Sequence, residues 1–151
     1  FSTYGSEDRE AVEQALTETG TRGLRNRLVH TLSGGERQNV YIAAALAQEA
    51  DVLLLDEPTA FLDYRHQIDI LATIARINRE ASKTVITVNH DVNAAVRNSD
   101  RILALKDGET AFLGTSDDFL RREVLESVFD TPFRFVDDPQ SDNPLALPAT
   151  A

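Results

Sequence analysis

Apolar residues recur at helical spacing in the first third of the chain. Over residues 6–19 they fall on one face, with a capping serine and two acids at the start and Gly20 positioned as the C-cap. A second helix is predicted over residues 35–49, and its alanine-rich middle, 40–47, is apolar all round, which is typical of a closely packed, buried helix. Residues 21–32 between them are predicted to form an irregular link.

Two short apolar runs flank the next amphipathic segment. Residues 52–55 are continuously apolar and residues 84–88 are almost all β-branched, as expected for parallel strands buried on both faces. Between them, isoleucines at helical spacing predict a helix over about 64–81. Strand, helix and strand within forty residues indicate a right-handed βαβ unit, and hence an α/β fold.

The remaining pattern predicts a hairpin, two short helices and a tail. Residues 101–106 and 109–113 flank Asp107-Gly108, a two-residue turn sequence. A capped helix is expected to begin at Ser116, followed by an amphipathic segment over 123–129. From Pro132 onward the chain is acidic and aperiodic, and we expect this tail, residues 132–151, to be partly disordered.

Composition narrows the classes of protein and partner. The 151 residues are 42% hydrophobic, and no run approaches the eighteen or so apolar residues of a membrane span. The absence of cysteine excludes disulfides and thiolate sites, and a net charge of −10 argues against nucleic acid as a partner. Because the chain begins at Phe1 and contains no methionine, we interpret it as a fragment of a longer protein.

The string Leu-Ser-Gly-Gly-Glu-Arg-Gln over residues 32–38 is the strongest local motif. Glycines at a helix start let backbone N–H groups approach an anion, and the helix dipole adds partial positive charge there. The hydroxyl of Ser33 can donate a further hydrogen bond. An ordinary capped helix start with flexible glycines is the alternative, and the local sequence alone favours it.

Polar residues follow both predicted strands. Asp56 and Glu57 end the first, and a carboxylate pair there suits a Mg²⁺ bound through water beside a base for an attacking water. An acidic turn is an equal alternative. His90 follows the second strand, on the same expected edge of the sheet, and could position that water. Taken singly, His90 is a strand-end histidine and Asp63 a helix N-cap.

The order of these motifs decides between the alternatives. The chain from about Ser6 to Phe133 resembles the ATP-binding-cassette (ABC) ATPase family. In that family LSGGERQ is the signature motif, LLLDEP is Walker B, Asp63 lies in the D-loop and His90 is the switch histidine. The resemblance implies part of a P-loop NTPase (RecA-like) core, with the end of the helical subdomain over 6–50 and the core elements over 51–131.

The resemblance also implies a shared ATP site. Two ATPase domains would face each other head to tail, and each signature motif would bind the γ-phosphate held by the partner. Asp56 would hold Mg²⁺, Glu57 and His90 would act in catalysis, and Asp63 would couple the two sites. The other nucleotide-binding residues implied are Ser33, Gly34, Gly35, Glu36 and Gln38. An integral membrane permease would be the further partner, at the cytoplasmic face of the membrane.

Residues 63–71 and 89–95 are similar to importers of ferric siderophores, haem and cobalamin. His66 and Gln67 mark this branch, and no catalytic role is predicted for them. Phe61 departs from the small residue usual in the D-loop. A soluble ABC protein of translation or DNA repair, and a non-catalytic half-cassette, are the alternative functions.

Two family features are absent from the 151 residues: the phosphate-binding loop GxxxxGK[ST] (Walker A) and the glutamine loop. The chain alone is therefore not expected to hydrolyse ATP. In the family, the Walker A strand lies between the strands predicted at 84–88 and 101–106. Without it, we expect unpaired edges, exposed apolar surface and an isolated chain that aggregates or is unstable.

Overall fold

A computed structural model describes residues 5–139, 141 and 143–149, which fall into two compact units. The first unit is residues 1–88 and the second is residues 89–151. Within the described part of the chain, the strands form three separate two-stranded sheets, one in the first unit and two in the second. No helix among the described residues is both long and apolar enough to cross a bilayer.

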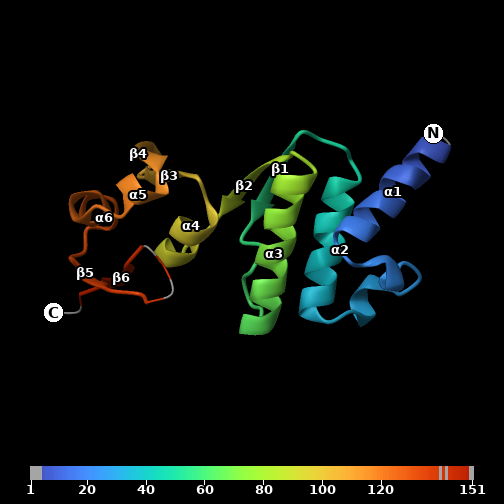
Figure 1. Cartoon of the computed structure of the whole chain (residues 1–151), viewed down its shortest axis with the longest axis horizontal. Coiled ribbons are helices and arrows are strands. Elements are labelled where there is room, and N and C mark those ends of the chain that lie inside the picture. The colour runs from blue at the N-terminus through green and yellow to red at the C-terminus, as the bar shows by residue number, and fades with distance from the viewer. Residues whose placement is uncertain (1–4, 140, 142, 150–151) are drawn as a thin grey trace. The chain divides into compact units, whose positions relative to one another are not determined.

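The first unit contains the elements that the hydrophobic pattern predicts (Figure 1). The irregular link holds two short 3-10 turns, Arg22–Leu24 and Val29–Thr31. The remaining elements are α1 (Ser6–Glu18), α2 (Gly34–Leu46), β1 (Val52–Asp56), α3 (Tyr64–Glu80) and β2 (Thr84–Val88).

Strands β1 and β2 pair in parallel, in register from Val52 opposite Thr84 to Asp56 opposite Val88. This pairing confirms the predicted parallel strand–helix–strand unit. The prediction that both faces are buried is wrong, because Leu53 is buried while Leu54 is 70% exposed. Burial on both faces needs helices on both faces, and the residues that pack with Leu53 come from α1, α2 and α3.

The core of this unit joins the helices to one face of the sheet. Ile42, Ile70 and Ile77 are almost fully buried and pack with the alternate leucines of β1. The alanine-rich middle of α2 predicts a helix buried all round. This prediction is wrong, because Tyr41 is 54% exposed. The segment 6–50 shares this core with β1, α3 and β2, and the unit ends after Val88; the subdomain division at residue 50 stays a prediction.

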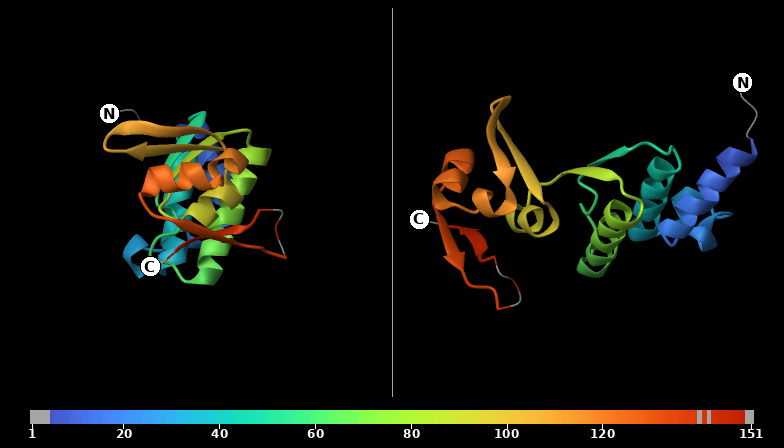
Figure 2. Two further views of the ribbon diagram at one scale, coloured as in Figure 1. Left: turned by 90° about the vertical axis from the view of Figure 1, so that its left-hand side faces the viewer. Right: turned by 45° about the horizontal axis from the view of Figure 1, so that its top comes forward.

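The second unit begins with a helix that the sequence analysis did not predict, α4 (Val92–Asn98), whose N-cap is Asp91. A hairpin of β3 (Arg101–Lys106) and β4 (Glu109–Thr115) follows, as predicted (Figure 2). Its turn residues Asp107 and Gly108 both have positive φ, 53° and 81°, as a type I′ turn requires. The unit is completed by α5 (Ser116–Phe119), α6 (Arg122–Phe129), β5 (Phe133–Val136) and β6 (Leu145–Pro148).

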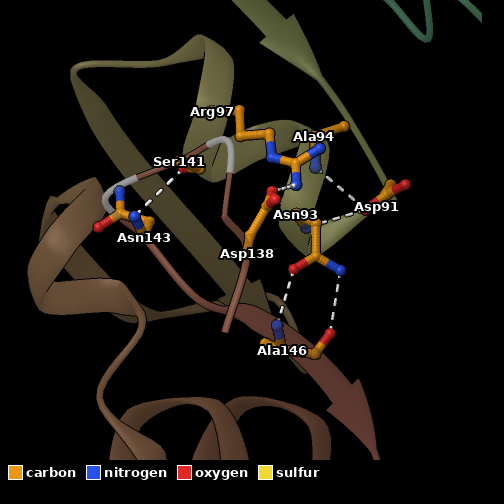
Figure 3. A network of polar contacts seen from close by, with 8 residues as sticks. All are labelled: Asp91, Asn93, Ala94, Arg97, Asp138, Ser141, Asn143 and Ala146. Atoms are coloured by element: carbon orange, nitrogen blue, oxygen red, sulfur yellow. Dashed lines mark hydrogen bonds and ion pairs between the residues drawn. The ribbon is translucent and has the colours of Figure 1, made fainter. Parts of the chain in front are cut away.

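The prediction of a disordered tail is wrong for β5 and β6, which pair in antiparallel fashion. Phe133 and Ala146 are buried in a core with Phe119 and Leu125. The side-chain amide of Asn93, on α4, donates to the backbone O of Ala146 at 2.9 Å and accepts from its backbone N–H at 2.8 Å (Figure 3). These contacts join residues far apart in the sequence, so local periodicity does not predict them. The sequence of the tail therefore shows no recognisable pattern.

Candidate functional site

Ser33 is the N-cap of α2 in a reciprocal capping box. Its Oγ accepts from the backbone N–H of Glu36 at 3.3 Å, and its own N–H donates to Glu36 Oε2 at 2.9 Å. The capped-helix interpretation is therefore right for the local structure. It does not exclude ligand binding, because a hydroxyl that accepts one hydrogen bond still has its own hydrogen to donate.

The next two backbone N–H groups, of Gly34 and Gly35, are the first of the helix. The N–H of Arg37 reaches the carbonyl of Ser33 at 2.9 Å, but those of Gly34 and Gly35 have no acceptor within the described part of the chain. They are the orphan donors that every helix N-terminus leaves. Together with the Ser33 hydroxyl, they form a donor set suited to an anion at the positive end of α2.

Glu36 has a supporting position at this loop. Both carboxylate oxygens are occupied, Oε2 by the N–H of Ser33 and Oε1 by Arg27 Nη1 at 3.2 Å. The hydrogen bond from the Ser33 backbone, helped by Arg27, lowers the pKa of Glu36 below its usual range. Gln38 is half-buried on the same helix.

Gly35 lies directly against the imidazole of His66, in the first turn of α3. A methyl group built on Gly35 would lie 2.1 Å from His66 Cδ2 and 2.7 Å from Cγ, so only glycine fits. The same construction at Gly34 would bring the methyl group to 3.3 Å from Leu62 Cδ2. The glycine pair therefore also allows close packing of two segments of the chain.

Asp63 is the N-cap of α3, and its carboxylate contacts both the backbone and the ring of His66. Oδ1 accepts from the His66 N–H at 3.0 Å, and Oδ2 lies 2.8 Å from His66 Nδ1. The backbone hydrogen bond, followed by the side-chain bond from His66, lowers the pKa of Asp63. The side-chain amide of Gln67 donates to the carbonyl of Leu62 at 3.0 Å, which fixes the preceding residue as well.

Asp56 and Glu57 stand at the end of β1, and both are exposed. Glu57 has left-handed backbone, φ 43°, its N–H donates to the carbonyl of Val88 at 3.2 Å, and its own carbonyl accepts from Ala60. A non-glycine residue in this region is uncommon, and such outliers cluster at functional sites. The chain leaves the strand in a sharp turn that ends the pairing with β2.

His90 is the second residue of the second unit, exposed and just before the cap of α4. On either side of it, Asn89 and Asp91 form a local turn in which Asn89 Oδ1 accepts from the Asp91 N–H at 3.1 Å. Asp91 Oδ1 then caps α4 through the N–H groups of Asn93 and Ala94.

Comparison with known proteins decides the family. The ABC transporter family model matches residues 2–60. The chain is 40% identical over 148 residues to the ferric enterobactin transport ATP-binding protein of Escherichia coli (strain K12), covering 98% of this chain and 55% of that protein. It is 42% identical over 147 residues to the iron(3+)-hydroxamate import ATP-binding protein of Bacillus subtilis (strain 168), covering 97% and 55%.

The chain belongs to the ABC transporter ATP-binding family. Its structure superposes on the inward-facing structure of a metal-chelate type ABC transporter with a TM-score of 0.88 and 29% identity, over 99% of this chain and 60% of the other. A dimeric ATP-binding cassette in a post-hydrolysis state with ADP and Pi matches with a TM-score of 0.61 and 35% identity, over 77% and 50%. These matches confirm the predicted α/β fold as part of a P-loop NTPase cassette. The chain spans about half the length of the curated relatives it matches.

In the first unit, the segment that corresponds to the ABC signature motif packs against the segment that corresponds to the D-loop. Gly34 lies beside Leu62 and Gly35 beside His66, whereas Asp56 and Glu57 stand separately at the end of β1. No group of three or more acidic or histidine side chains among the described residues could hold a metal ion by itself.

The contact of His66 with Gly35 was not predicted from the sequence, in which His66 is only a marker of the importer branch. The sequence carries a weak signal for a role of this residue in the spacing of Asp63 and His66. His66 lies three residues after a capping aspartate, on the same turn as Asp63 and within reach of it. Its approach to Gly35, far away in sequence, could not be read from spacing.

Proposed function

We propose that the chain is part of the ATP-hydrolysing subunit of an ABC importer for an iron siderophore, haem or cobalamin. The single observation that carries the proposal is the donor set at the start of α2, in a chain about 40% identical to siderophore-import ATP-binding proteins. The hemin import ATP-binding protein of Rhodopseudomonas palustris (strain BisA53), 42% identical over 137 residues, extends the substrate class.

The Ser33 hydroxyl and the N–H groups of Gly34 and Gly35 bind the γ-phosphate of ATP held by a second copy. Orphan N–H groups bind an anion without breaking any internal hydrogen bond, and the dipole of α2 favours the negative charge. Glu36 serves by holding Ser33 in place, since both of its oxygens accept from donors within the chain. Gln38 is assigned to the same motif by its position on α2.

Asp56 and Glu57 serve the nucleotide of their own subunit. Carboxylate oxygens are the donors that Mg²⁺ prefers, and Asp56 is exposed at the strand end, so it fits a water-mediated Mg²⁺ ligand. When bound, Mg²⁺ neutralises charge on the phosphate oxygens. Glu57 orients and deprotonates the attacking water, and His90 holds that water or the γ-phosphate oxygen through an imidazole nitrogen.

The partners are a second ATPase subunit, arranged head to tail, and an integral permease. The dimeric cassette among the structural neighbours and the metal-chelate transporter support this arrangement. Location at the cytoplasmic face of the membrane follows from the proposed permease. The net charge of −10 argues against a nucleic-acid partner.

The test is Glu57→Gln in the full gene product. The variant keeps the size of Glu57 and removes its basicity, so ATP turnover should fall at least about 100-fold while ATP still drives dimerisation. Glu10→Gln, on the exposed face of α1, is the matched control and should hydrolyse ATP at the parent rate. Turnover of Glu57→Gln at the parent rate would refute the catalytic assignment.

A non-catalytic half-cassette that only dimerises is the second candidate function, since the signature motif and the D-loop would serve that role as well. Equilibrium binding of ATP to the full gene product separates the two. Micromolar binding supports the ATPase, whereas no detectable binding supports a module that only dimerises.

A further inference from the structure

The contact between the signature motif and the D-loop is a close interlock formed within one subunit. The His66 ring occupies the space that a side chain at residue 35 would need, and Leu62 lies close beside Gly34, where an added methyl group would make a tight contact at 3.3 Å. The two glycines and the two D-loop side chains therefore fit together closely, and at Gly35 there is no room for an added carbon. Any rigid shift of one segment has to be followed by the other.

The D-loop side of this interlock is itself fixed at three points. Asp63 binds the backbone and the ring of His66, and Gln67 binds the carbonyl of Leu62. The imidazole has two edges with different roles, because Nδ1 faces Asp63 while Cδ2 and Cγ face Gly35. Changes at Asp63 therefore reach the backbone of Gly35 through a single ring.

We propose that His66 is a positioning residue that links Asp63 of the D-loop to the phosphate-binding N–H group of Gly35. The inference rests on the proposed function, since the donors at Gly34 and Gly35 serve a nucleotide only if the chain is an ABC ATPase. His66 makes no contact with ATP in this role. It sets the direction of a backbone donor, so that movement of the D-loop moves the donors that the same subunit presents to the γ-phosphate held by the second copy.

The link also gives Gly35 a reason to be glycine that is independent of the ligand. Alanine is a better helix former than glycine by up to about 1 kcal/mol, so Gly35→Ala in α2 should stabilise the protein if space were available. Beside His66 it should instead destabilise, because overpacking against a ring 2.1 Å away forces backbone or side-chain shifts. The sign of the effect thus depends on residue 66.

A double-mutant cycle in the full gene product tests this packing. We expect Gly35→Ala alone to lower Tm by at least about 4 °C. In a His66→Ala background the same substitution should cost little or raise Tm, because only the 3.1 Å approach to the Cβ of residue 66 remains. An equal loss in both backgrounds would overturn the interlock. This measurement needs no ATP, so it stands or falls separately from the proposed function.

The coupling itself is tested with variants that separate the two edges of the ring. His66→Phe keeps a planar ring against Gly35 and loses the bond to Asp63, whereas His66→Asn keeps a donor for Asp63 and loses most of the ring. Arg65→Ala is the matched control, because Arg65 is exposed on the same turn and its side chain makes no hydrogen bond or ion pair within the described residues.

Each variant is combined with Glu57→Gln, and the ATP concentration for half-maximal dimerisation is measured beside ATP binding to the monomer. We expect His66→Phe and His66→Asn each to raise that concentration at least about 5-fold, with monomer binding and the Arg65→Ala control unchanged. Dimerisation like that of the control in both ring variants would overturn the positioning role. Equal weakening of monomer binding would show a general loss of structure and would overturn it too.

Discussion

The carboxylate of Asp63 binds His66 at two points, the backbone N–H at 3.0 Å through Oδ1 and the imidazole Nδ1 at 2.8 Å through Oδ2. One acid therefore caps α3 and orients the ring that packs on Gly35. Glu36 does the equivalent work at α2, where it holds Ser33 and Arg27. The Asp63 cap of α3 and the Glu36 carboxylate of the α2 capping box fix the two sides of the contact between signature motif and D-loop.

The hydrogen bonds that the carboxylates of Asp63 and Glu36 accept predict a loss of stability in acid. The pKa values of Asp63 and Glu36 are lowered below their ordinary values of 3.8 and 4.5, mainly by backbone hydrogen bonds from His66 and Ser33. The stability that they contribute is therefore complete above those ordinary values and is lost as pH falls through the lower folded-state values. Urea unfolding between about pH 2.5 and pH 6 should show this decline.

The acid prediction has a direct control. The double variant Asp63→Asn with Glu36→Gln cannot change charge at these positions, so its stability should depend less on pH below about pH 4.5 than that of the parent. An unchanged slope would mean that other carboxylates account for the acid sensitivity.

Ser33 can be tested for its two roles separately. Ser33→Ala removes the cap and should cost about 1 kcal/mol of unfolding free energy. Ser33→Asp preserves the cap but places a negative charge where the phosphate is proposed to bind. We therefore expect near-parent stability and lost ATP-driven dimerisation for Ser33→Asp. Dimerisation at the parent level would argue against phosphate binding at this residue.

Phe61 is fully exposed and has left-handed backbone, φ 60°. Phe61→Gly should stabilise the protein by about 0.5–1 kcal/mol, because glycine adopts this conformation without steric cost. Phe61→Ala removes the same ring but keeps a Cβ, so it should give no such gain. Chemical denaturation of the two variants side by side measures the difference, and equal stabilities would show that the backbone conformation is not strained.

Asn93 is expected to hold the C-terminal hairpin in place. Asn93→Ala removes both hydrogen bonds to Ala146 and leaves two buried or half-buried backbone groups unpaired, at a cost of about 1–3 kcal/mol. Hydrogen exchange at the Ala146 amide should accelerate. Asn98→Ala is the control, since within the described part of the chain the Asn98 side chain bonds only to Ala94 in its own helix. Equal protection of Ala146 in both variants would contradict this role.

The exposed apolar side chains of β1 and β2 predict self-association of residues 1–151 in isolation. Leu54 is 70% exposed and Ile86 is 50% exposed, on neighbouring strands in register. Light scattering should detect oligomers, and Leu54→Thr with Ile86→Thr should shift the population toward monomer. A monomeric chain with a cooperative melt would contradict the prediction.

Much of the local structure could be predicted because it depends on local rules. The helical spacing of apolar residues placed α1 and α3 within a residue or two, and the β-branched run placed β2. Asp107-Gly108 specified its hairpin turn. Burial was predicted less well. The apolar run of β1 looked two-sided, yet only one face meets helices within its unit. Helix α4 was missed because its seven residues carry too little periodicity.

The features of the candidate site also separate into those that the sequence predicts and those that depend on the tertiary structure. By itself, the sequence determined the motifs, the caps of α2 and α3 and the family, because these depend on residue type at fixed short spacing. Only the tertiary structure decided that His66 covers Gly35, that Leu62 lies beside Gly34 and that Asn93 pairs with Ala146. Each of these contacts joins residues about thirty or more positions apart, and close packing, not local propensity, selects them.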